Sequence, residues 1–318
     1  MKKIIIAISI VMCFASCKNT KEDKVISKEE AMATMFPKQK IKIKTIGILL
    51  YDGYSTLDAM GPYQVLGELM GVDVFFIGRN KGLIADGRGM KVQCDKSIDD
   101  VKQLDVLVIP GGFKKTYEAT KDTALLNWIK AIDVNSKYTT SVCTGAWILG
   151  ATGILKDKEA TTHWYGKNIL AKEFGAKVQN KRFVKSGKYW TSAGITAGMD
   201  MSLALVNEIM GEQYTKRAML DLEYDPQPPF KGGSEQNTEK DIVENMRTMY
   251  DDGMVTVLHP EKALKSIKLD CEKDLFCGMP MKESVADTAQ YKGKIYGFCS
   301  STCKKEFMMK PVKYLSKK

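Results

Sequence analysis

Apolar segments typical of buried strands alternate with amphipathic segments from residue 43 to about residue 211, and this alternation constrains the fold more than any other feature. It is typical of a mostly parallel sheet that helices cover on both faces. The predicted strands span residues 43–51, 72–78, 105–112, 138–143, 178–184 and 189–192, and the predicted helices span residues 58–70, 122–132, 145–155, 165–174 and 196–210. The sequence therefore predicts an α/β sandwich.

Polar and small residues that could take part in catalysis or binding follow three of the predicted strands. Asp58 follows the first strand, Gly111 and Gly112 end the third, and Cys143 ends the fourth. Ligands bind at the carboxyl ends of strands in such sheets. Gly145 lets a helix begin close to the strand, so the pattern predicts a nucleophile elbow whose helix N-terminus depresses the pKa of the Cys143 thiol. A buried structural cysteine is the alternative interpretation.

Several ordered motifs across about residues 43–235 resemble the ThiJ/PfpI superfamily. They are YDG at 51–53 with LDAMGP at 57–62, VIPGG at 108–112, VCTGA at 142–146, ATTHW at 160–164, TSAGITAGMD at 191–200 and EYDPQPPF at 223–230. The chain is similar to the branch that holds isocyanide hydratases and the amidotransferase-like half of AraC-type regulators. The resemblance implies a flavodoxin-like, class I glutamine amidotransferase-like sandwich that forms a homodimer, and the last motif is especially like the hydratases.

The resemblance also implies roles for two residues. Cys143 would attack the carbon of an isocyanide, a small electrophilic substrate, and form a thioimidate, while Asp58 would move protons. Water would then release an N-substituted formamide. For Asp58 the alternative is a helix N-cap, which aspartate also favours.

Four further residues are candidates for supporting roles. The N–H groups of Gly111 and Gly112 are predicted to face developing negative charge as an oxyanion site, with a plain tight turn as the alternative. Thr144 is predicted to orient Asp58 or a bound water. His163 is a candidate for a structural, a substrate-facing or a catalytic role, and the α/β domain itself is expected to need no cofactor.

Other functions stay open. A glyoxalase or deglycase of the same superfamily usually has a glutamate at the position of Asp58 and a histidine beside the cysteine, where this chain has Thr144. A metal-binding or metal-sensing envelope lipoprotein, whose α/β domain binds a ligand without turnover, is a second alternative. Glutaminase chemistry is disfavoured, because His259 lies beyond the resembled region and Pro260 indicates an ordinary helix start there.

The N-terminus has the pattern of an exported lipoprotein. Two lysines, an apolar run too short to span a bilayer and two small residues precede Cys17. We expect residues 1–16 to be a signal peptide, Cys17 to carry the lipid anchor, and residues 17–42 to form a polar tether. An ordinary signal peptide is the alternative. Under either interpretation the mature protein is exported, and the lipoprotein interpretation places it in the bacterial cell envelope, as a periplasmic or outer-membrane lipoprotein.

The last 49 residues, 270–318, have a different, cysteine-rich pattern. They resemble the YHS domain, a small TRASH-like metal-binding module, and a connector at 236–269 with a helix near 239–250 precedes them. Cys299 and Cys303 are four residues apart and face one side of a helix start. With Cys277, and Cys271 as a possible fourth ligand, they predict a zinc or copper site. A disulfide-stapled module is the alternative in an oxidising compartment.

The net charge does not indicate a nucleic-acid partner. Basic residues number 48 against 38 acidic ones, a net +10. Within residues 262–318 there are 13 lysines and 6 acids, so +7 of the excess lies in the tail. No basic helix carries base-reading residues, and the chain lacks the DNA-binding helix-turn-helix pair of the resembled regulators.

Overall fold

The computed structural model describes residues 27–35, 37–258, 269–281 and 285–316. A seven-stranded sheet forms its centre, in the order β10-β11-β7-β6-β1-β2-β5. All neighbouring strands run parallel except the pair β10 and β11. The strands are β1 (Thr45–Leu50), β2 (Asp73–Gly78), β5 (Lys96–Ser97), β6 (Val106–Ile109), β7 (Tyr138–Val142), β10 (Phe183–Ser186) and β11 (Tyr189–Ser192). This confirms the predicted flavodoxin-like class.

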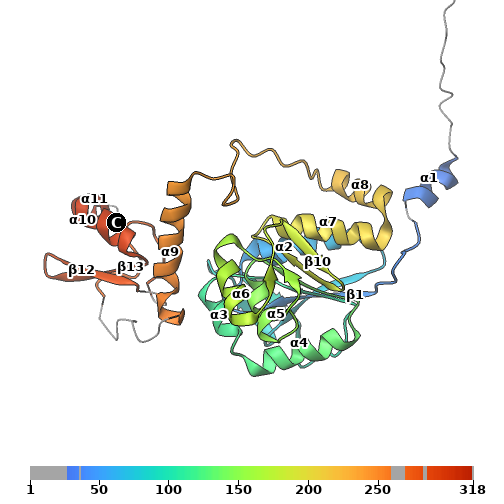
Figure 1. Ribbon diagram of the computed structural model, residues 1–318, viewed down its shortest axis with the longest axis horizontal. Helices are drawn as coiled ribbons and strands as arrows, with labels where there is room; N and C mark the ends of the chain where they lie inside the picture. Colours follow the sequence, from blue (N-terminus) through green and yellow to red (C-terminus); the bar gives the residue numbers. More distant parts are fainter. Residues whose placement is uncertain (1–26, 36, 259–268, 282–284, 317–318) are drawn as a thin grey trace, which may run out of the picture.

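Helices cover both faces of the sheet (Figure 1). On one face α2 (Thr56–Leu66) packs against α7 (Ala197–Met210), which also contacts α8 (Glu212–Asp221). On the other face α5 (Gly145–Ala151) contacts α3 (Lys114–Ala119), α4 (Thr123–Asn135) and α6 (Lys167–Phe174).

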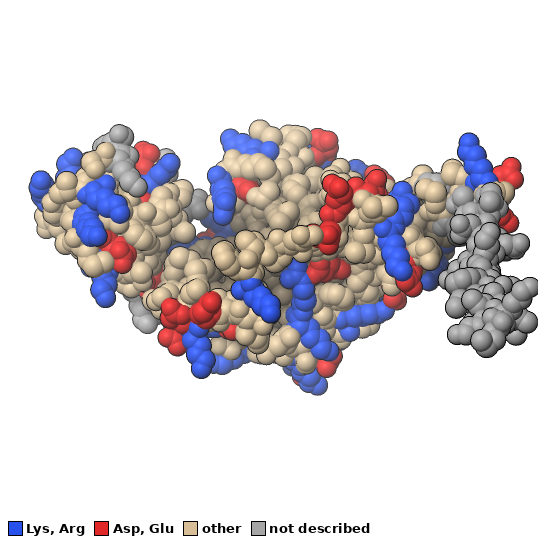
Figure 2. All heavy atoms as spheres, turned by 90° about the horizontal axis from the view of Figure 1, so that it is seen from above, with Lys and Arg blue, Asp and Glu red and all other residues tan. Residues whose placement is uncertain are grey.

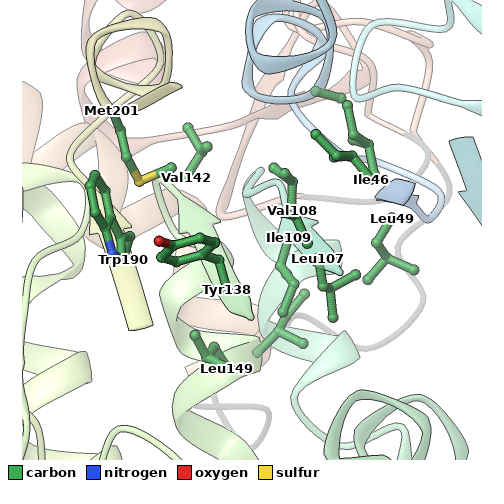
Figure 3. Close-up of a cluster of buried hydrophobic side chains, with 14 of the residues drawn as sticks. Ile46, Leu49, Leu107, Val108, Ile109, Tyr138, Val142, Leu149, Trp190 and Met201 are labelled. Carbon is green, nitrogen blue, oxygen red and sulfur yellow. The ribbon is translucent and has the colours of Figure 1, made fainter. Parts of the chain in front are cut away.

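The core lies between the sheet and these helices. Central strands are buried on both faces, which explains their near-continuous apolar runs. Figure 3 shows Val142 and Trp190 next to Met201 of α7, with Leu149 of α5 on the other side of Tyr138. The buried strands hold the residues at their carboxyl ends in fixed positions.

Some local elements differ from the prediction. The predicted strand at 178–184 is two pieces, β9 (Lys177–Val178), which pairs with β8 (Glu159–Ala160), and β10. A hairpin of β3 (Gly82–Ala85) and β4 (Lys91–Cys94) was not predicted. The expected tether contains α1 (Lys28–Met35), because Ser27 and Glu30 form a reciprocal capping box.

The cysteine-rich segment folds into a small module with its own core. It contains β12 (Asp287–Tyr291), antiparallel to β13 (Lys294–Phe298), then α10 (Ser301–Met309) and α11 (Pro311–Leu315). Phe298 and Phe307 are fully buried at its centre. A long helix, α9 (Lys240–Leu258), contacts both α3 of the sandwich and α10 of the module (Figure 1). Asp252 of α9 accepts hydrogen bonds from the N–H and hydroxyl of Ser301 at 2.7 and 2.8 Å.

Basic and acidic side chains are interspersed over the face drawn in Figure 2. Within the described ranges, no helix combines the length and the apolar character needed to cross a membrane. The predicted signal peptide and Cys17 lie outside the described residues.

Candidate active site and metal centre

Cys143 lies in a strained turn between β7 and α5. Its φ is +55°, a left-handed conformation that costs about 1–3 kcal/mol for a residue with a side chain. Its N–H donates to the carbonyls of Ser192 and Ala193, both at 3.1 Å. A Cβ on Gly145 would lie 2.2 Å from the carbonyl oxygen of Ile109, so only glycine lets α5 begin this close to β6. The turn is the predicted elbow, and the thiol is 5% exposed.

Asp58 reaches the same place from the first turn of α2 and is fully buried. Its Oδ2 accepts a hydrogen bond from the N–H of Gly111 at 3.1 Å. Its Oδ1 is buried and has no partner with regular hydrogen-bond geometry among the described residues. The N-cap of α2 is Ser55, so Asp58 is not the helix cap of the alternative interpretation. The structure therefore brings the two predicted residues together.

Burial sets the protonation of this pair. Burial raises the pKa of Asp58 to about 7, although hydrogen bonds from the Cys143 thiol and the Gly111 N–H oppose the rise. Burial, followed by the nearby charge of Asp58, raises the pKa of the Cys143 thiol well above its usual value. The predicted depression of the Cys143 pKa is therefore wrong, because desolvation and a neighbouring carboxylate outweigh the N-terminus of a helix only seven residues long.

The predicted oxyanion donors are already engaged. The N–H of Gly111 donates to Asp58, and the N–H of Gly112 donates to the Thr144 hydroxyl at 2.9 Å. That hydroxyl in turn donates to the Gly112 carbonyl at 2.8 Å. In this structure Gly111 positions the acid and Thr144 fixes the glycine turn. The predicted roles of both N–H groups toward a substrate, and of the Thr144 N–H and hydroxyl toward Asp58 or a water, stay predictions.

Two other backbone N–H groups face the sulfur. Hydrogen bonds from the N–H groups of Thr144 and Ile195 act to lower the pKa of the Cys143 thiol, against its burial. Ile195 was missed as a site residue. Its φ of +43° and its place within the motif at 191–200 are the signals that it serves the site through its backbone.

His163 lies beside the elbow. The preceding residue, Thr162, donates its hydroxyl to the Cys143 carbonyl at 2.7 Å. Burial, followed by the charge of Lys167, lowers the pKa of His163 to about 4. The imidazole is therefore neutral at pH 7, so His163 is not an imidazolium that could act as a general acid there. His259 lies outside the described residues.

Four side chains of the C-terminal module converge on one point. Ligand atoms of Asp274, Cys277, Cys299 and Cys303 lie within 4.8 Å of one another. The Cys299 sulfur lies 3.4 Å from both the Cys277 and the Cys303 sulfur. Tetrahedral zinc with Zn–S bonds of about 2.3 Å would separate its sulfurs by about 3.8 Å. The three thiols and the carboxylate therefore fit a thiophilic metal ion.

Asp274 was missed, and Cys271 was predicted as a possible fourth ligand. The Cys271 sulfur accepts from the Gly297 N–H at 3.5 Å and lies outside the cluster. Asp274 is 1% exposed, and no Lys or Arg pairs with it in the described part of the chain. Its Oδ2 accepts from the Cys299 N–H at 2.9 Å. Its position three residues before Cys277 was the available sequence signal.

The chain matches two families. A model of the DJ-1/PfpI family matches residues 44–208, and a model of the YHS domain matches residues 273–318. An isonitrile hydratase of Pseudomonas putida is 36% identical over 202 residues, which are 64% of this chain and 88% of the relative.

Two further relatives are informative. A solved ThiJ/PfpI family protein from Pseudomonas syringae is 31% identical, with a TM-score of 0.65 over 71% of this chain and 93% of that chain. An HTH-type transcriptional regulator of Pseudomonas aeruginosa is 27% identical over 172 residues, 52% of this chain and 50% of the regulator. The similarity thus extends to an enzyme and to half of a regulator.

Proposed function

The chain belongs to the DJ-1/PfpI family, and from this membership we propose that it is a cysteine-dependent hydratase that converts an isocyanide and water into an N-substituted formamide. The observation that carries the proposal is the buried pair of Cys143 and Asp58, in which a carboxyl with a pKa of about 7 faces a thiol. A carboxyl of that pKa is suited to both accept and return a proton at neutral pH.

The first half of the reaction forms a covalent bond. Asp58 takes the thiol proton as the Cys143 sulfur adds to the terminal carbon of the isocyanide. Asp58 then delivers this proton to the same carbon, which leaves a thioimidate, R–N=CH–S. The N–H groups of Thr144 and Ile195 stabilise the sulfur while it carries negative charge.

The second half consumes water. Water adds to the thioimidate carbon, and Asp58 transfers a proton from this water to the nitrogen. The C–S bond then breaks, the remaining hydroxyl proton returns to the sulfur through Asp58, and R–NH–CHO leaves. The sum is isocyanide plus water to formamide, with the enzyme regenerated.

Turnover tests the proposal directly. The full-length chain in mild detergent is incubated with methyl isocyanide in ¹⁸O-labelled water, and the formamide is measured by mass spectrometry. We expect labelled N-methylformamide from the wild-type chain and from Cys94→Ala, a control at another buried thiol, and none from Cys143→Ala. No product from the wild-type chain would refute the proposal.

The C-terminal module is proposed to hold one zinc or copper ion through Cys277, Cys299, Cys303 and Asp274. When bound, the ion supplies structural stability rather than reaction chemistry, since a core this small gains much of its stability from a metal. Asp274 additionally fixes the ligand loop through its bond to the Cys299 N–H.

The envelope location is also a proposal. The sequence at residues 1–17 supports lipidation at Cys17. Growth of an expressing bacterium with labelled palmitate should label the wild-type chain but not Cys17→Ser. Equal labelling of both would refute lipid anchoring at this residue.

A further inference from the structure

The helix α9 places an aromatic ring against the active-site side of the sandwich. The Tyr250 ring stacks on Tyr165 with centroids 4.8 Å apart and an interplanar angle of 25°. It also meets Phe113 at 5.4 Å, and His163 and Trp164 at 5.6 Å each. Tyr250 is thus the one ring that touches all four others of this cluster.

The cluster borders the backbone that builds the reaction centre. Phe113 directly follows Gly112, whose N–H is hydrogen-bonded to the Thr144 hydroxyl. His163 directly follows Thr162, whose hydroxyl is hydrogen-bonded to the Cys143 carbonyl. After burial, the charge of Cys143 is the further cause that raises the pKa of Tyr250, so the phenol lies within electrostatic reach of the sulfur.

Three contacts hold α9 in this position. Asp251 accepts a hydrogen bond from the Tyr165 hydroxyl at 2.9 Å. Arg247 pairs with Glu235 at 2.6 Å, and Glu235 also pairs with Lys167 at 3.2 Å. In the C-terminal third of the helix, a Cβ on Gly253 would lie 2.8 Å from the Phe113 ring, so this packing needs glycine. The helix lies beyond residues 44–208, the part that matches the family model.

We propose that Tyr250 is a specificity-determining residue, whose ring is the wall against which the N-substituent of the substrate lies. The inference rests on the proposed hydratase activity. The C–N–C unit of an isocyanide is linear, so a carbon held against the Cys143 sulfur sends its substituent straight away from the elbow. The aromatic rings that border the elbow would favour a flat, apolar substituent such as benzyl over a small alkyl group.

The test compares benzyl and methyl isocyanide. An aromatic contact of about 0.5–1.5 kcal/mol corresponds to about 2- to 12-fold in the ratio of their kcat/KM values. We expect Tyr250→Leu to lower the benzyl-to-methyl ratio within this range, and Tyr250→Phe to keep it within twofold. Ile242→Ala, an exposed apolar residue of the same helix, is the matched control and should leave the ratio unchanged.

A second readout does not depend on turnover. The rates at which iodoacetamide and N-benzyl iodoacetamide alkylate Cys143 are measured by peptide mass spectrometry. Tyr250→Leu should lower the benzyl-to-plain ratio here too, with circular dichroism showing that the helix is retained. An unchanged alkylation ratio in a folded variant would overturn the role of Tyr250. A wild-type chain that shows the alkylation preference but hydrates neither isocyanide would overturn the hydratase proposal alone.

Discussion

Replacing Asp58 by asparagine should damage catalysis and stabilise the fold at once. Raising the pKa of a carboxyl from 3.8 to about 7 corresponds to about 4 kcal/mol. The folded pKa of Asp58 lies above the unfolded one. Its contribution to the free energy of unfolding is therefore fully present below pH 3.8 and is lost as the pH rises through about 7. At pH 8 the wild-type chain bears the full cost of a buried carboxylate, which asparagine removes.

Catalysis should respond in the opposite direction. Asp58 must be ionised to accept the thiol proton, so kcat/KM of the wild-type chain should fall tenfold per pH unit below about pH 7 and level off above it. Asp58→Asn should lower the rate by at least about a hundredfold, the low end of general acid–base contributions, and remove this acid limb.

Two assays measure the pair of effects. All four tryptophans lie in the sandwich, so their fluorescence during urea unfolding reports on that domain. Between pH 5 and pH 8 the wild-type chain should lose more stability than Asp58→Asn, by about 1–4 kcal/mol. Asp73→Asn, at an exposed carboxylate, should change neither stability nor rate. An equal pH dependence in the wild-type chain and Asp58→Asn, or an undiminished rate in Asp58→Asn, would refute the assigned protonation.

Three further predictions concern a hydrogen bond, the metal cluster and the oligomeric state. Thr144→Val should lower the free energy of unfolding by about 1–3 kcal/mol, measured by urea titration, because it leaves the Gly112 N–H without its acceptor; no loss would contradict the hydrogen-bond assignment. The double variant Cys299→Ser/Cys303→Ser should lose a near-stoichiometric zinc or copper ion in elemental analysis, whereas Cys271→Ser, outside the cluster, should keep it; a metal-free wild-type chain purified under reducing conditions would argue against the site. Light scattering at micromolar concentration should give the mass of a homodimer, and a monomer would contradict that expectation.

The order of apolar runs and motifs along the chain was enough to predict the architecture and the location of the two chemical centres. Uninterrupted apolar runs that alternate with amphipathic segments are typical of central parallel strands, whose carboxyl ends share one edge, and this predicted that Asp58 and Cys143 lie near each other. The spacing of Cys277, Cys299 and Cys303 likewise predicted a shared site. These features are local patterns joined by simple topology, and the structure confirms the class and the cluster.

How these residues act depends on the way distant segments pack together. The pKa of Cys143 depends on burial and on a carboxylate 85 positions earlier in the chain, and no local pattern reports either quantity. The same holds for the engaged N–H of Gly112 and for Asp274 in place of Cys271. Tyr250 reaches the site on a helix that lies far along the chain and outside the matched family region. Desolvation and long-range contacts arise when distant segments pack together. The sequence therefore located the site, while packing set the protonation of its residues and brought the aromatic side chains next to it.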